Sequence, residues 1–106
     1  MEASQQGDTS MIGQIIRLKI RQGTQAEFEA LVGQLMKDVV AIEPGAIYDV
    51  RRVRGAPETY FYFISFPDQA AYDRYMEADY HTSMSPKAIA LLDGEPVFED
   101  LDRFGE

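Results

Sequence analysis

The sequence predicts one small α+β domain in which helices cover one face of an antiparallel sheet. Three observations predict this class. Four segments alternate in the two-residue period of strands, and segments between them carry the three- and four-residue spacing of amphipathic helices. The length of 106 residues suits a single domain. Residues 60–66 (Tyr-Phe-Tyr-Phe-Ile-Ser-Phe) place apolar or aromatic side chains on both faces of a strand, so both sides of its sheet need a cover.

The first strand and the first helix follow from simple patterns. Residues 11–21 alternate between apolar and polar side chains, which predicts a strand. A capping box begins a helix directly afterwards, because the Thr24 hydroxyl can accept from the Glu27 amide. Residues 44–45 (Pro-Gly) stop that helix. Its apolar stripe consists of Phe28, Leu31, Val32, Leu35, Met36 and Val39.

The next two strands are expected to form a hairpin. Residues 46–54 alternate as a second strand, with Tyr48 and Arg51 on opposite faces. A short connection at 55–57 (Gly-Ala-Pro) leads into the aromatic strand at 60–66, which predicts antiparallel pairing of the two strands.

The last third of the chain predicts a second helical region and a closing strand. Asp68 is expected to cap a helix, which a loop or kink around Asp79 interrupts. Pro86 suits the first turn of a further helical piece, and residues 97–104 alternate as a fourth strand. The resulting order is the ferredoxin-like βαββαβ pattern, a four-stranded antiparallel sheet with both helices on one face. Its open face predicts a homodimer, because the aromatic strand would otherwise expose too large an apolar patch.

The composition and charge of the chain limit which domain organisation, partners and cofactors are expected. Residues 1–10 are predicted to be a disordered tail, and residues 11–106 the domain. No basic stretch followed by an apolar core begins the chain, so we expect no signal peptide and a cytoplasmic location. The net charge of -8 argues against nucleic acid and anionic membranes as partners. With no cysteine and one histidine, the sequence predicts no metal site, and no other cofactor is expected.

A few side chains are candidates for chemistry near neutral pH. His81 is the only histidine and is the natural general acid or base, although a surface or capping histidine is the alternative interpretation. Tyr75 and Tyr72 lie on the inner stripe of the second helical region shortly before His81. Arg51 belongs to the only basic cluster and could hold a phenolate or carboxylate, or pair with acidic side chains across strands.

Three segments together carry a family resemblance. They are Gly-Thr-Gln-Ala-Glu-Phe at 23–28, Glu-Pro-Gly at 43–45 and Phe-Pro-Asp-Gln-Ala-Ala-Tyr at 66–72. In these the chain resembles the antibiotic biosynthesis monooxygenase family, whose members are dimeric α+β barrel proteins. The family includes cofactor-free oxygenases of phenols and quinols as well as relatives that degrade haem. The haem-degrading branch carries a pocket tryptophan where this chain has Phe66, so the resemblance favours the branch without haem.

The resemblance implies a function and a set of roles. The implied function is a cofactor-independent monooxygenase that acts on a small aromatic phenol or quinol held between the sheet and the helices. His81 would take or relay the proton, while Tyr75 or Tyr72 and Arg51 would hold the oxyanion. On the aromatic strand, Tyr62 and Phe66 are expected to contact the substrate. The alternative is a dimer of the same fold that binds a small molecule without turning it over.

Overall fold

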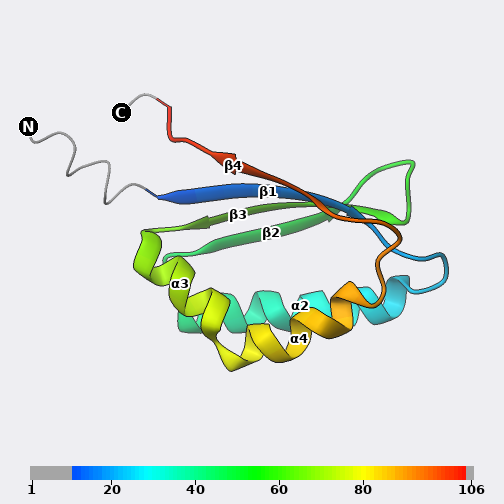
Figure 1. Ribbon diagram of the computed structural model, residues 1–106, viewed down its shortest axis with the longest axis horizontal. Coiled ribbons are helices and arrows are strands. Elements are labelled where there is room, and N and C mark those ends of the chain that lie inside the picture. Colours follow the sequence, from blue (N-terminus) through cyan, green and yellow to red (C-terminus); the bar gives the residue numbers. More distant parts are fainter. Residues whose placement is uncertain (1–10, 105–106) are drawn as a thin grey trace, which may run out of the picture.

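The computed structural model describes residues 11–104 (Figure 1). Its elements follow one another as β1 (Ile12–Lys19), α2 (Gln25–Ile42), β2 (Ile47–Arg52), β3 (Thr59–Phe66), α3 (Gln69–Glu77), α4 (Asp79–Ile89) and β4 (Val97–Leu101). This is the predicted ferredoxin-like order, with the second helical region divided into α3 and α4. The predicted tail at residues 1–10 lies outside the described residues and stays a prediction.

The strands form one antiparallel sheet in the order β2-β3-β1-β4. Tyr62 of the central strand β3 lies opposite Ile16 of β1 and Val50 of β2. Residues that face each other across neighbouring strands point to the same side of a sheet. All three helices lie along that one side, and the other side of the sheet is open (Figure 1). The predicted hairpin between β2 and β3 is confirmed.

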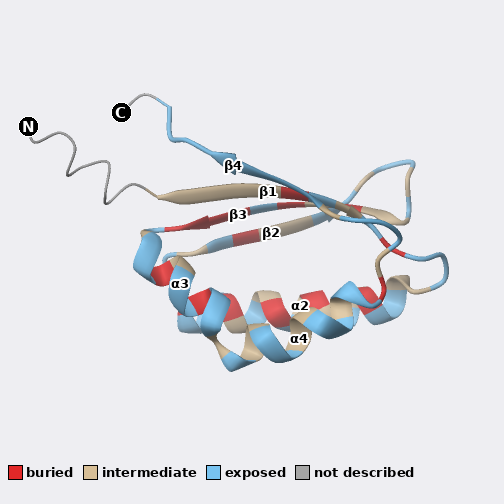
Figure 2. Ribbon diagram, viewed as in Figure 1, coloured by how far each residue is buried: buried red, intermediate tan, exposed pale blue. Residues whose placement is uncertain are grey.

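The hydrophobic core fills the space between the sheet and the helices (Figure 2). One edge of α2 is buried, as the predicted stripe requires, and the helix-facing side of β3 is buried with it. The buried hydrophobic residues of these two elements are Phe28, Val32, Leu35, Val39, Tyr60, Tyr62, Ile64 and Phe66. The aromatic strand therefore has one face in the core, and its other face is the open one.

Helix α2 begins where the sequence predicted, but the predicted capping box is wrong. The Thr24 hydroxyl donates to the Arg21 carbonyl oxygen at 2.7 Å and makes no bond to an amide of the first turn. An N-cap side chain usually reaches those amides from an extended backbone, whereas Thr24 has φ -106° and ψ 9°. Gly23, with φ 87°, forms the turn that points the hydroxyl back along the chain.

Helices α3 and α4 confirm one local prediction and correct another. The Asp68 carboxylate accepts from the Ala71 amide at 2.8 Å, so Asp68 caps α3 as predicted. The break falls at Ala78, whose ψ of 144° is extended. Pro86 does not begin a separate helix but lies inside α4, because amides of the first turn already bond to the Ala78 carbonyl. A proline inside a helix removes one backbone donor, and α4 continues through it. His81 therefore stands on a helix and not in a loop.

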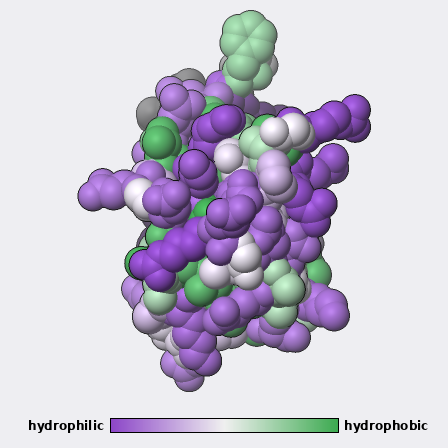
Figure 3. Space-filling view, turned by 90° about the vertical axis from the view of Figure 1, so that its right-hand side faces the viewer, coloured by the Kyte–Doolittle hydropathy of each residue, from purple (hydrophilic) through white to green (hydrophobic). Residues whose placement is uncertain are grey.

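Apolar side chains gather on the open face of the sheet. Ile47, Phe63 and Leu101, from three different strands, are exposed on it and line a shallow groove. The end of the molecule that carries the loops differs from this face, because hydrophilic side chains cover most of it and apolar ones are scattered (Figure 3). Part of the exposed apolar surface of the described residues therefore lies on the open face of the sheet, where the sequence predicted contact with a second subunit.

Candidate functional site

A cavity of about 230 Å³ lies between the sheet and the helices. All four strands and all three helices contribute side chains to it, and most of these are aliphatic or aromatic. Its polar lining comprises Gln14, Tyr48, Tyr62, Tyr72, Tyr75, His81 and Ser85. No Asp, Glu, Lys or Arg occurs among the described residues that line it. Such a space suits an uncharged ligand with an apolar body and few polar groups.

Four of the six predicted site residues meet in this cavity. Strand β3 presents Tyr62, helix α3 presents Tyr72 and Tyr75, and helix α4 presents His81. The ring centroid of Tyr75 lies 6.2 Å from that of Tyr72 and 4.5 Å from that of His81. Residues three apart share one helix face, which explains the two tyrosines. The break at Ala78 then turns the chain, so that the first turn of α4 brings His81 to the same space.

An ion pair anchors α3 to the end of α2. Arg74 donates from Nε and Nη2 to the two carboxylate oxygens of Glu43, at 2.7 and 2.8 Å. Glu43 is only 5% exposed, and the hydrogen bonds from Arg74 hold its pKa below the usual value. Because Arg74 directly precedes Tyr75, this pair fixes the rotation of α3 that points Tyr75 into the cavity.

The imidazole of His81 is held in one tautomer. Its Nδ1 lies 3.2 Å from the Met76 carbonyl oxygen, which can only accept a hydrogen bond, so Nδ1 carries the proton. Burial lowers the pKa of His81 below its ordinary value, against the opposing effect of that backbone bond. The ring is therefore neutral at pH 7, and Nε2 keeps a lone pair. A neutral imidazole with a free Nε2 beside an apolar cavity can take a proton from a bound hydroxyl.

Two buried phenols pair beside the imidazole. The hydroxyl oxygens of Tyr48 on β2 and Tyr75 on α3 lie 2.8 Å apart. Burial raises the pKa of Tyr48 and of Tyr75, so both stay protonated and act as neutral hydrogen-bonding groups. Sequence reasoning named Tyr75 but not Tyr48. The alternation of the second strand could have indicated Tyr48, because it places Tyr48 and Arg51 on opposite faces. Only the pairing with β3, in which Tyr48 lies opposite the buried Ile64, shows that the face with Tyr48 is the one covered by the helices.

The other two cavity tyrosines differ in their surroundings. Burial raises the pKa of Tyr62, and its hydroxyl has no hydrogen-bonding partner among the described residues. Tyr72 is only half-buried. Burial and the nearby Asp100 carboxylate raise the pKa of Tyr72, whereas a hydrogen bond with Gln14 opposes that rise. Tyr62 is thus a donor available to a ligand, and Tyr72 stands at the edge of the cavity.

The structure does not bring Phe66 and Arg51 to the cavity lining. Phe66 is fully buried behind it, with its ring 5.0 Å from Tyr75 and 5.6 Å from Tyr72. Arg51 points to the opposite face of the sheet, because it lies opposite Phe61 in the register with β3. There its side chain is 76% exposed, and its Nε donates to the Asp49 carboxylate at 2.9 Å. Within one protomer Arg51 is on the wrong side of the sheet to hold an oxyanion beside His81.

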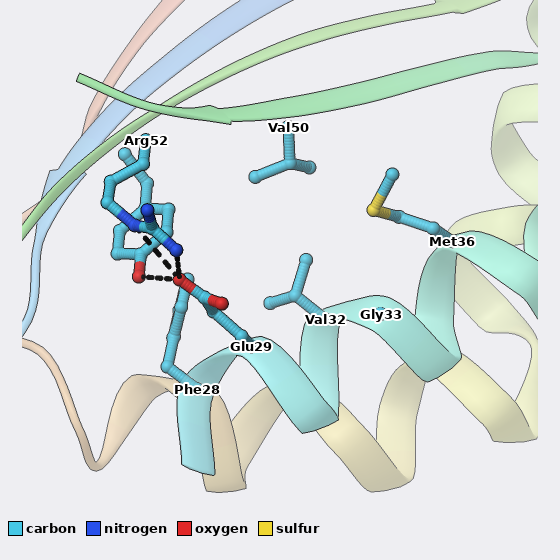
Figure 4. A pocket seen from close by; sticks show the side chains of 8 residues that line it. Phe28, Glu29, Val32, Gly33, Met36, Val50 and Arg52 are labelled. Carbon is cyan, nitrogen blue, oxygen red and sulfur yellow. Dashed lines mark hydrogen bonds and ion pairs between the residues drawn. The ribbon is translucent and has the colours of Figure 1, made fainter. Parts of the chain in front are cut away.

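A second cavity, of about 220 Å³, lies between α2 and β2 (Figure 4). At one end the Glu29 carboxylate accepts from Arg52 at 2.7 Å and from the Tyr60 hydroxyl at 2.5 Å. These bonds, from Tyr60 first and then Arg52, lower the pKa of Glu29. The three polar groups satisfy one another and tie α2 to the sheet. The cavity with His81 instead contains polar groups that have hydrogen-bonding capacity left over.

Within residues 11–104, no three His, Cys, Asp or Glu side chains lie close enough together to hold a metal ion. Across the same residues, none of the helices is both long and apolar enough to cross a membrane.

The fold and the site define the class of this chain. The chain is a ferredoxin-like α+β protein with an aromatic cavity between its sheet and its helices. Residues 11–87 match the family model described as antibiotic biosynthesis monooxygenase, and the chain belongs to that family. The resemblance found in the sequence is thereby confirmed. Among curated proteins, none matches this chain.

Solved structures agree with this assignment. A Caulobacter crescentus CB15 protein, provisionally assigned as an antibiotic biosynthesis monooxygenase, is 25% identical, with a TM-score of 0.86 over 99% of this chain and 100% of that one. A Mycobacterium tuberculosis protein is 18% identical, with a TM-score of 0.81 over 92% and 98% of the two chains. A conserved Methanosarcina mazei Go1 protein is 19% identical, with a TM-score of 0.79 over 92% and 96%. The last two show the fold alone.

Proposed function

We propose that this chain is a monooxygenase that acts, without a bound cofactor, on a small uncharged phenol or quinol. The observation that carries the proposal is the placement of His81, which lines the cavity and has its Nδ1 bound to the Met76 carbonyl oxygen, so that Nε2 is left with a lone pair. Membership of the antibiotic biosynthesis monooxygenase family supports the reaction class. The substrate class is inferred from the lining of the cavity.

The size and polarity of the cavity favour a one-ring aromatic ligand. An apolar cavity of about 150 Å³ is known to hold benzene, so about 230 Å³ leaves room for a ring with small substituents. Aromatic walls favour a planar ligand. A carboxylate or phosphate would lose its hydration and meet no cation there, which disfavours anionic substrates.

The proposed reaction uses His81 as base and tyrosine hydroxyls as donors. Nε2 of His81 takes the proton of the bound phenol, and Tyr75 and Tyr62 donate to the developing oxyanion. The phenolate then supplies electrons to dioxygen. One oxygen atom enters the ring, the other leaves as water, and the phenol is oxidised to a quinone. For a hydroquinone the products are a hydroxyquinone and water, so atoms and electrons balance without a further reductant.

We further propose that the protein works as a homodimer joined through the open faces of two sheets. The exposed Ile47, Phe63 and Leu101 on that face supply the apolar contact. Each protomer then keeps its own cavity on the other side of its sheet. The predicted cytoplasmic location remains a prediction.

Dioxygen consumption with hydroquinone tests the function. The rate above the autoxidation background is measured for the parent, for His81→Ala and for Thr82→Ala, an exposed neighbour on α4 that serves as the matched control. Removing a general base lowers rates by about 100-fold or more, so we expect His81→Ala to approach background and Thr82→Ala to match the parent. Equal rates in the parent and His81→Ala would contradict the proposal.

The alternative function is binding without turnover in the same cavity. The specific observation behind it is the large share of phenols in the lining, which can hold an aromatic ligand without any chemistry. It predicts that p-nitrophenol binds the parent while hydroquinone causes no dioxygen consumption above background.

A further inference from the structure

We propose that Tyr48 is a positioning residue: it donates a hydrogen bond to the Tyr75 oxygen, so that Tyr75 donates its own proton to the oxygen of a bound phenol. This inference depends on the proposed function, because it concerns how the cavity holds the same phenolic oxygen. It adds a residue from β2 to the proposed reacting groups Tyr62, Tyr75 and His81, which come from β3, α3 and α4.

The proton count of the pair carries the first step. Two phenols whose oxygens are 2.8 Å apart share one hydrogen bond and use one of their two protons in it. No other hydrogen bond to either hydroxyl exists among the described residues. Both residues line the cavity, so the second proton is available to a ligand there. The pair therefore offers the cavity one donor, in whichever direction its internal bond runs.

The neighbours of the two rings give the direction. The Tyr75 ring lies 4.5 Å from the His81 ring, whereas the closest ring contacts of Tyr48 are with Tyr62 and Tyr75. Because the Tyr75 ring is the one that lies beside the His81 ring, we assign to Tyr75 the donation to a ligand oxygen that gives its proton to the imidazole. Tyr48 must then be the donor within the pair. A phenol that accepts one hydrogen bond donates the next more strongly, so Tyr48 strengthens Tyr75 as a donor.

Binding of p-nitrophenol tests this role, since its neutral and ionised forms absorb at different wavelengths. Titrations with the parent, Tyr48→Phe and Tyr75→Phe give the affinity and, over a range of pH, the pKa of the bound probe. Tyr48→Phe keeps the ring and removes only the donor. We expect a loss of affinity of about 3- to 10-fold and a bound-probe pKa raised by about half a unit, with larger changes in Tyr75→Phe.

Tyr80→Phe is the matched control. The Tyr80 hydroxyl is buried without a hydrogen-bonding partner among the described residues, and its ring lies 6.4 Å from Tyr75. Its removal takes away a phenol oxygen near the site without touching the pair, so both binding readouts should stay at parent values. A general loosening of the site would instead alter the bound-probe pKa in Tyr80→Phe as well.

The outcomes separate the two proposals. If the parent binds no p-nitrophenol, the proposed function fails and the positioning role fails with it. If the parent binds the probe and Tyr48→Phe shows the same affinity and the same bound-probe pKa, only the positioning role is overturned. Unfolding in urea of the two single variants and the double variant checks the bond itself. Its presence predicts that their effects on the unfolding equilibrium constant depart from additivity by about 3- to 10-fold.

Discussion

Phe66 supports the cavity wall from behind, and its replacement should cost stability much more than ligand affinity. The side chain has 0% exposure and packs against the rings of Tyr75 and Tyr72. A buried Phe→Ala change costs about 3–5 kcal/mol, and aromatic pairs contribute about 0.5–1.5 kcal/mol beyond burial. Because Phe66 makes two such aromatic pairs, Phe66→Ala should lower the free energy of unfolding by about 5 kcal/mol, the upper end of this range. That approaches the whole stability of a small domain, about 5–15 kcal/mol.

The informative variant is therefore Phe66→Leu, which keeps most of the volume and should cost about 1–2 kcal/mol. Urea unfolding followed by circular dichroism measures this cost, with Val40→Ala as a control at a 51% exposed position of α2. The control should change stability by less than about 0.5 kcal/mol. Because Phe66 does not line the cavity, the affinity of Phe66→Leu for p-nitrophenol should stay close to that of the parent. Unchanged stability together with a large loss of affinity would refute this placement and restore Phe66 as a ligand contact.

Three further predictions follow from the fold and from His81. Asp68→Ala should lower the free energy of unfolding by about 1 kcal/mol through loss of the α3 cap, whereas Thr24→Ala, which removes no cap bond, should cost about 0.5 kcal/mol or less in the same urea assay. Phe63→Asp should turn the proposed homodimer into monomers in sedimentation velocity, because its carboxylate would be buried without a partner; a dimer that persists would place the interface elsewhere. The folded-state pKa of His81 lies below its value of about 6.5 in the unfolded chain, so the unfolded state binds more protons just below that pH. Stability should therefore fall as the pH drops through this window, and the His81→Ala profile should be flatter there.

Local patterns predicted the elements because each depends on residues near in sequence. The stripe of α2 and the cap at Asp68 are set by helical spacing and by a single side chain. The aromatic strand β3 predicted that the sheet is one layer among several, since its apolar side chains on both faces require another layer on each side. The two local errors, at Thr24 and Pro86, arose where the preceding backbone decides what a side chain or a proline does.

The site was predictable only in part, because it depends on packing between distant elements. Alternation placed Tyr48 and Arg51 on opposite faces of the second strand, but only the register with β3 shows that the helices cover the side with Tyr48. The pair of Tyr48 and Tyr75 joins residues 27 positions apart and depends on how α3 docks on β2. His81 could be named from its chemistry alone. Its tautomer depends on the Met76 carbonyl, which the break before α4 brings to its ring.

The fate of the two atoms of dioxygen tests the central claim most directly. Hydroquinone is incubated under isotopically heavy dioxygen with the parent or with His81→Ala, the mixture is quenched with a reductant to stop exchange of quinone oxygens with water, and the product is analysed by mass spectrometry. A monooxygenase with His81 as its base predicts one heavy oxygen atom in each product molecule formed by the parent, and product at background level with His81→Ala. Unlabelled product from the parent, or equal labelled product from both proteins, would contradict it.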